Sequence, residues 1–182
     1  MNKVDPIKDL EDVRRILDVL KDNDRNYLLA LYGFYSGLRI SDILPLKVKD
    51  VRGKTHFRIT EEKREHKREI VIPSKLRKIT AKYIEGKDDN EFLFKSRQGY
   101  NRPICETQAY RILNDAADKA SLKENIGTHS LRKTFAYHLY ENTHDIIYVQ
   151  EVLGHRDINT TKRYLGIDLD EIDSVIAKLG FI

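Results

Sequence analysis

The stretch that decides the fold is GTHSLRKTFAYHLYENTHDIIYVQEVLGHRDINTTKRYLGI, residues 127–167. It carries two helical patterns, at about 129–142 and 145–153, and Gly154 fits the end of the second helix. A further short turn of helix is expected around Tyr164. Packing alone asks for none of the four side chains that the stretch places in order: His129, Arg132, His155 and Tyr164.

These side chains suit the binding of an anion. His129 and Arg132 are three residues apart, so on a helix they project from the same side. A guanidinium offers a planar fork of donors, and an imidazole can give or take a proton. A solvated helix face would explain such a pair in most proteins, and a core position would explain most tyrosines. However, Lys162 and Arg163 beside Tyr164 indicate a surface near anions, where a phenol could attack phosphorus.

The first third of the chain reads as helical. Residues 9–21 form an amphipathic pattern, with Asp9 as the expected N-cap. The segment NYLLALYGFYSG, residues 26–37, is apolar on most sides, which predicts a buried helix that ends in a left-handed turn at Gly37. A new short helix is expected to follow, with Ser41 as its candidate cap.

The pattern then changes period. KTHFRI, residues 54–59, alternates, and REIVIP, residues 68–73, is a β-branched run, so both are expected to be strands. The polar segment 60–69 between them is a natural hairpin tip, and EFLF at 91–94 is a candidate third strand. The other helices are expected at 74–85, capped by Ser74, at 106–120, and in a tail within 168–182. The predicted fold class is therefore α+β, mostly α-helical with a small antiparallel β-sheet.

The composition limits the class of protein. The chain has 182 residues, of which 34% are charged and 40% hydrophobic, which suits one soluble domain spanning residues 1–182. No apolar run approaches the roughly 20 residues that span a bilayer, and the N-terminus lacks the apolar core of a signal peptide. The lone Cys105 cannot form an internal disulfide, so a cytoplasmic setting is expected. The net charge of +4 is compatible with a polyanionic partner but does not identify one.

A further arginine stands in SGLRISDIL. Arg39 follows one expected helix end and precedes the next helix, so a turn would direct its side chain across the domain. A surface salt bridge is the simpler interpretation of an isolated arginine. Asp42 is either a partner that orients Arg39 or an acid favoured in the first turn of a helix.

Taken together, these motifs resemble the tyrosine recombinase (phage integrase) family. SGLRISDIL, a polar hairpin containing lysine, HSLRK, LGH and a tyrosine nine residues later agree with the family in order and spacing. The resemblance runs from about residue 7 to residue 167 and implies the family's catalytic-domain fold. HSLRKTFAYHLY and RYLGI are most similar in style to integrases of phages and mobile elements from Gram-positive bacteria.

The resemblance implies a mechanism. Tyr164 would attack a DNA phosphodiester, giving a 3′-phosphotyrosyl link and a free 5′-hydroxyl. Arg39 and Arg132 would hold the non-bridging oxygens in the transition state. His129 would act as general base or as a further phosphate donor, and His155 would donate a hydrogen bond to the phosphate. No metal or cofactor is expected, because the arginines supply the positive charge.

In this family the general acid is a lysine on the β-hairpin, and the hairpin here offers two. Lys63 stands four residues after Ile59, which matches the family's register from the incoming strand. Lys67 matches better when counted back from Pro73. Lys63 is favoured, and a solvated turn would also explain both.

The expected partner is double-stranded DNA, bound by a homo-oligomer, in this family a tetramer. The N-terminal core-binding domain that most integrases carry is expected to be absent, so DNA binding should be weak and sensitive to salt. The tail helix, 168–182, would pack in cis or dock on a neighbouring protomer. Two alternatives remain open: a type IB topoisomerase-like relaxing enzyme and a non-catalytic DNA-binding remnant. The intact set of candidate residues argues against a remnant, and the target DNA sequence cannot be read from the chain.

Overall fold

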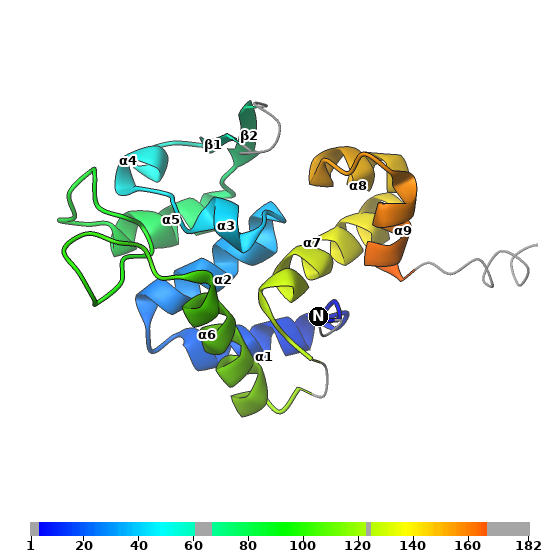
Figure 1. Ribbon diagram of the computed structural model, residues 1–182, viewed down its shortest axis with the longest axis horizontal. Coiled ribbons are helices and arrows are strands. Elements are labelled where there is room, and N and C mark those ends of the chain that lie inside the picture. Colours follow the sequence, from blue (N-terminus) through cyan, green and yellow to red (C-terminus); the bar gives the residue numbers. More distant parts are fainter. Residues whose placement is uncertain (1–3, 61–66, 123–124, 167–182) are drawn as a thin grey trace, which may run out of the picture. The chain divides into compact units, whose positions relative to one another are not determined.

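The computed structural model describes residues 4–60, 67–122 and 125–166. The chain divides into two compact units, residues 1–135 and 136–182. The elements of the first unit are α1 (Leu10–Leu20), α2 (Asp24–Ser36), α3 (Ile40–Ile43), α4 (Val48–Val51), β1 (His56–Thr60), β2 (Lys67–Val71), α5 (Ser74–Tyr83) and α6 (Glu106–Lys119) (Figure 1). Three helices follow: α7 (Thr128–Thr143), which begins in the first unit, then α8 (Ile146–Leu153) and α9 (Ile158–Leu165).

These helices and the two short strands confirm the predicted fold class, α+β and mostly α-helical. None of the helices in the described part of the chain is both long and apolar enough to cross a membrane.

The first two helices begin and end where the sequence indicates. Asp9 caps α1 by accepting a hydrogen bond from the backbone N–H of Glu11 at 2.8 Å. Asn23 caps α2 in the same way. Gly37 ends α2 in a left-handed conformation with φ of 60°, as predicted. The buried residues of α2 lie on most sides of the helix, which contacts α1, α3 and α5.

Two predicted serine caps are wrong. Ser41 lies inside α3, because the extended backbone of Arg39 places its carbonyl where the N–H groups of Asp42 and Ile43 can donate to it. Ser74 is the first residue of α5, and the carbonyl of Pro73 accepts the first hydrogen bond of that helix. In both places a backbone carbonyl starts the helix without a side-chain cap.

The two predicted strands pair antiparallel, in a register that runs from His56 opposite Val71 to Thr60 opposite Lys67. On their inward face Phe57 lies opposite Ile70 and Ile59 lies opposite Arg68, and the three apolar side chains are buried.

The candidate third strand is wrong: within the described residues, EFLF makes only an isolated bridge, between Phe92 and Lys47. Leu93 and Phe94 are buried, and the N–H of Leu93 donates to the carbonyl of Leu46, in the irregular segment before α4, at 2.8 Å.

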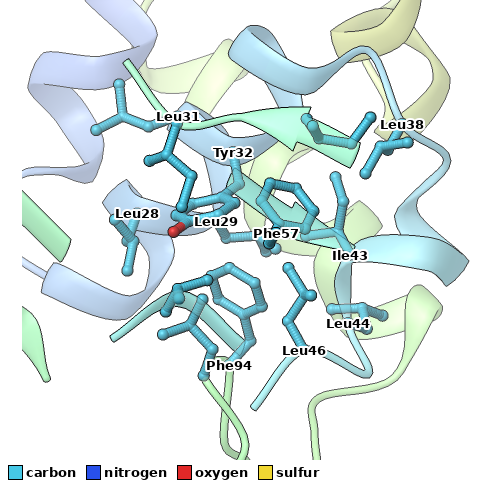
Figure 2. Close-up of a cluster of buried hydrophobic side chains, with 14 of the residues drawn as sticks. Leu28, Leu29, Leu31, Tyr32, Leu38, Ile43, Leu44, Leu46, Phe57 and Phe94 are labelled. Carbon is cyan, nitrogen blue, oxygen red and sulfur yellow. The ribbon is translucent and has the colours of Figure 1, made fainter. Parts of the chain in front are cut away.

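The first unit holds two apolar clusters. One joins α2, the sheet and α5, and the ring of Tyr32 packs against those of Phe57 and Phe94, with centroids 5.7 and 5.8 Å away (Figure 2). Burial raises the pKa of Tyr32 to about 12. The other cluster joins α1 and α6 to Leu131 at the start of α7. These contacts position the beginning of α7, which carries two of the candidate site residues.

The second unit begins within α7 and contains α8 and α9, which contact each other. Asp145 caps α8, which ends at Gly154 in a left-handed conformation with φ of 66°, as predicted. Asp157 caps α9, so the short helical turn expected around Tyr164 is confirmed as an eight-residue helix. The predicted tail helix, 168–182, lies outside the described residues.

Candidate active site

The first half of the candidate site is built on the turn between α2 and α3. This turn carries Arg39, whose side chain is exposed. Its geometry depends on Gly37, which adopts φ of 60° and leaves no room for a side chain: a Cβ there would lie 2.2 Å from the ring of Phe135. A left-handed turn packed directly against α7 therefore sets the direction of the chain at Arg39.

Arg132 joins this turn to α7. Its guanidinium donates a 2.6 Å hydrogen bond from Nη1 to the carbonyl of Gly37, two residues before Arg39. The side chain is only 1% exposed, which sequence reasoning did not anticipate. A buried guanidinium is costly unless it is hydrogen-bonded, so the contact with Gly37 fixes both the arginine and the turn.

Gly37→Ala tests this turn. Alanine would meet both left-handed strain and the ring of Phe135, so the variant should lose about 3 kcal/mol of unfolding free energy. Gly53→Ala is the matched control, because Gly53 has φ of 66° but an added Cβ would have no atom within 4 Å, and about 1 kcal/mol is expected there. Denaturant unfolding of both variants measures the difference, and equal losses would contradict the role of the Phe135 contact.

His129 lies in the same half of the site. Partial desolvation lowers the pKa of His129 below its ordinary value of 6.5, and the positive charges of Arg132 and Arg39 lower it further. Glu106 opposes this shift and Lys133 adds to it. The imidazole is therefore neutral near pH 7, in the form that can accept a proton. Because both arginines lower the pKa of His129, the three groups share one electrostatic environment.

An NMR titration of His129 should show a pKa below 6.5. Arg39→Ala removes a neighbouring positive charge and should raise this pKa toward the ordinary value. Glu106→Gln removes a carboxylate that favours the imidazolium and should lower the pKa further. Because the folded-state pKa is depressed, this histidine opposes folding progressively as the pH falls below 6.5. Shifts of the same sign in both variants would contradict the opposite effects assigned to Arg39 and Glu106 on the pKa of His129.

The second half of the candidate site holds Tyr164 and His155. Their rings pack edge to face, with centroids 4.8 Å apart and planes at 68°. Tyr164 is only partly buried, whereas Tyr32 lies wholly inside the core, so the interpretation of Tyr164 as a buried core tyrosine is wrong. The phenol thus lies beside an imidazole and within reach of solvent.

The chain holds His155 closely at the end of α8. Its backbone N–H donates to the carbonyl of Gln150 at 3.0 Å, and the amide of Gln150 donates back to the carbonyl of His155 at 3.1 Å. On the side chain, Nδ1 lies 3.0 Å from the hydroxyl of Thr161, a residue of α9 that is completely buried. Backbone and ring are therefore both restrained.

This arrangement fits one family. Residues 9–170 match the phage integrase family, which is most of the chain. The chain belongs to the phage integrase family. The resemblance inferred from HSLRK, LGH and the tyrosine is thereby confirmed.

Several relatives of this integrase-family chain carry matching names. It is 47% identical over 171 residues to a probable integrase/recombinase, YoeC, of Bacillus subtilis, covering 93% of each chain. It is 30% identical to the tyrosine recombinase XerA of Pyrococcus furiosus, covering 94% of this chain but 61% of XerA. The chain thus spans nearly all of one relative and about three fifths of the other.

Solved structures show the same fold. A XerA recombinase superimposes with a TM-score of 0.77 at 21% identity, over 98% of this chain and 65% of that one. A XerH recombinase bound to its difH DNA superimposes with a TM-score of 0.77 at 22% identity, over 97% and 53%. The catalytic domain of the bacteriophage HP1 integrase gives 0.64 at 23% identity, over 98% and 97%. The tyrosine recombinase catalytic-domain fold predicted from the sequence is confirmed.

Within this integrase-family chain the candidate residues fall into two groups. Arg39, His129 and Arg132 belong to the first unit, and His155 and Tyr164 to the second. The favoured lysine, residue 63, lies outside the described residues. The alternative lysine, residue 67, begins β2.

Sequence reasoning missed Thr161 and Gly37 as parts of the candidate site. The signal for Thr161 was its place three residues before Tyr164, which puts both on one face of α9. Gly37 was predicted only as the end of a helix. Its contact with Arg132 joins residues 95 apart in the chain and leaves no local pattern.

The integrase-family chain also has an arginine-lined hollow in its first unit, with a volume of about 630 Å³. Arg25, Arg97 and Arg111 line it from α2, the segment before α6, and α6 itself, together with several amide side chains. The guanidinium of Arg25 donates to the carbonyl of Lys95 at 2.9 Å. Desolvation lowers the pKa of Arg25, and the charge of Arg97 lowers it further. Asp115 also lines the hollow, so three guanidiniums face one carboxylate, and this positive excess is suited to a polyanion.

Proposed function

We propose that this chain is a site-specific DNA recombinase that cuts and rejoins strands through a 3′-phosphotyrosine at Tyr164. Residues 1–182 would act as one catalytic domain of a phage or mobile-element integrase in a bacterial cytoplasm. The observation that carries the proposal is that the positive charges of Arg39 and Arg132 both act on His129 and lower its pKa, while Arg132 also donates to Gly37 in the turn that carries Arg39. Two cations that also depress the pKa of a histidine form an environment suited to a phosphate.

Each strand cleavage exchanges one phosphate ester for another. The phenolic oxygen of Tyr164 bonds to phosphorus, and the bond between phosphorus and the 5′-oxygen breaks. The phenolic proton passes to neutral His129, and the leaving oxygen takes a proton from Lys63, with Lys67 as the alternative donor. A 5′-hydroxyl of a second strand reverses these steps, so no external energy source is needed.

The remaining groups stabilise the transition state. Arg39 and Arg132 donate to the non-bridging oxygens, where negative charge develops, and His155 donates a further hydrogen bond. Arg132 is 1% exposed, so DNA binding must uncover its guanidinium in part. The fixed positive charge of two guanidiniums performs the charge neutralisation for which other enzymes of DNA cleavage use metal ions.

The proposed partner is double-stranded DNA, bound by a tetramer of this chain. Solved structures with the same fold include a XerH recombinase bound to difH DNA and a λ integrase dimer bound to a core site. The positive net charge and the arginine-lined hollow support the same partner.

The hollow allows this proposal to be tested through salt dependence. Arg97→Ala and Arg111→Ala should each reduce DNA affinity and make the slope of log K against log salt shallower by about one unit, because one fewer phosphate is neutralised. Arg14→Ala is the control, since Arg14 is paired with Glu11 on the exposed face of α1. Fluorescence anisotropy at several salt concentrations measures the slopes, and an equal change in all three variants would argue against DNA in the hollow.

A nicked suicide substrate tests the proposed function. The DNA should carry the attachment site found as a direct repeat beside the gene, with a nick that releases the cleaved 5′-end. Active protein should become linked to the DNA in a complex that survives denaturant. Relaxation of supercoiled plasmid without site preference would instead indicate a topoisomerase. Binding without any adduct would indicate a non-catalytic DNA-binding protein.

A further inference from the structure

The hydroxyl of Thr161 has an environment that no catalytic role yet explains. The residue is 0% exposed, and within the described part of the chain the only hydrogen-bond partner of its Oγ1 is Nδ1 of His155, at 3.0 Å. A hydroxyl supplies one hydrogen and can also accept, and a neutral imidazole has one nitrogen of each kind. The direction of this hydrogen bond therefore fixes which nitrogen of His155 carries the hydrogen.

Burial decides the direction. If Nδ1 carried the hydrogen and donated it, the hydroxyl hydrogen of Thr161 would be left inside the protein without an acceptor, which is unfavourable. If the hydroxyl donates, both partners are satisfied by one bond. We propose that Thr161 donates its O–H to Nδ1 and so holds neutral His155 with its N–H on Nε2.

Other contacts restrain the backbone and the ring of His155. Hydrogen bonds with Gln150 hold the backbone of His155 on both sides, and the ring of Tyr164 packs against its imidazole. Because Thr161 and Tyr164 lie three residues apart on α9, one helix carries both the proposed nucleophile and the hydroxyl that orients its neighbour. Thr161 is thus a positioning residue, acting through His155.

This assignment gives His155 a defined role in the proposed function. The adduct-formation arm of the test below rests on that proposed function. An N–H on Nε2 is a ready donor to a phosphate oxygen and needs no rotation or proton transfer when DNA binds. Without the hydroxyl, the neutral ring could place its hydrogen on either nitrogen. The fraction with Nδ1–H would then present an acceptor where a donor is required.

The first arm of the test is independent of DNA. Two-bond ¹H–¹⁵N NMR correlations of the imidazole identify the protonated nitrogen, recorded well above the ordinary histidine pKa of about 6.5. Wild-type protein and Thr161→Ser should show the N–H on Nε2, whereas Thr161→Val should show a population with the N–H on Nδ1. A wild-type spectrum with the N–H on Nδ1 would overturn the proposal whether or not the valine variant folds.

The second arm measures the rate of adduct formation on the suicide substrate. Thr161→Val should be slower by about tenfold, the loss expected for one hydrogen bond, and Thr161→Ser should remain within about twofold of wild type. Thr160→Val is the matched control: it makes the same change one residue earlier and should leave the rate unchanged. Equal losses in the serine and valine variants would contradict the proposal, because a purely structural defect would not be rescued by a hydroxyl.

The two arms separate two failures. If wild-type protein forms no adduct, the proposed function fails while the NMR pattern still decides the position of the proton. If wild-type protein forms the adduct but its N–H lies on Nδ1, the proposed function stands and the role of Thr161 falls.

Discussion

Tyr164→Phe should abolish the covalent DNA adduct, a loss of at least about 10⁴-fold, because it removes the hydroxyl of the proposed nucleophile. The fold should be unaffected. The side chain is only partly buried, and phenylalanine keeps the ring that packs 4.8 Å from His155. Denaturing gel electrophoresis after incubation with the suicide substrate measures the adduct, and thermal unfolding checks the fold.

Tyr148→Phe is the matched control for this variant. Tyr148 lies on α8 in the same unit, is 47% exposed and has no proposed role in the reaction. Its adduct yield should equal that of wild type. Retention of the adduct in Tyr164→Phe would disprove the assignment of the nucleophile, and its loss in Tyr148→Phe would point to a general defect of the second unit.

Arg39→Ala and Arg132→Ala should both reduce activity, but only Arg132→Ala should also reduce stability. Alanine at either position should slow adduct formation by about 10²- to 10³-fold, the usual cost of removing one donor to a transition-state oxygen. Only Arg132→Ala should also destabilise the fold, by about 3 kcal/mol, because it opens a cavity and leaves the buried carbonyl of Gly37 without its donor. Arg39 is exposed, so its variant should unfold like wild type.

Denaturant unfolding and adduct kinetics on the same preparations measure both effects. Arg14→Ala serves as a control for the loss of a positive charge on the surface. Equal stability of the two site variants would contradict the structural role of Arg132. Full activity of Arg39→Ala would remove that residue from the proposed site.

Sequence periodicity was sufficient for most of the fold. Apolar spacing located the longer helices but not the four-residue helix α4, and Asp9, Gly37 and Gly154 marked helix ends correctly because each acts through its own neighbours. Ser41 and Ser74 failed as caps because a carbonyl one or two residues earlier started each helix. A favourable side chain near a helix start does not fix the first hydrogen bond when the backbone can supply it.

The membership of the candidate site stays a prediction. Order, spacing and the family resemblance predict Arg39, His129, Arg132, His155 and Tyr164 as a set. The burial of Arg132 and its bond to Gly37 depend on tertiary contacts between α7 and the α2–α3 turn, which no local pattern encodes. EFLF failed as a strand for a related reason, since its partner segment before α4 is too irregular to form a ladder.

A crystal structure of the protein trapped on a suicide DNA substrate tests most directly whether the candidate residues of both units act on one phosphate. It should show the oxygen of Tyr164 bonded to phosphorus, with donors from Arg39 and Arg132 about 3 Å from oxygens of that same phosphate. His155 should reach it through Nε2. Guanidiniums bound to different phosphates, or a phosphorus bonded to another residue, would contradict the account.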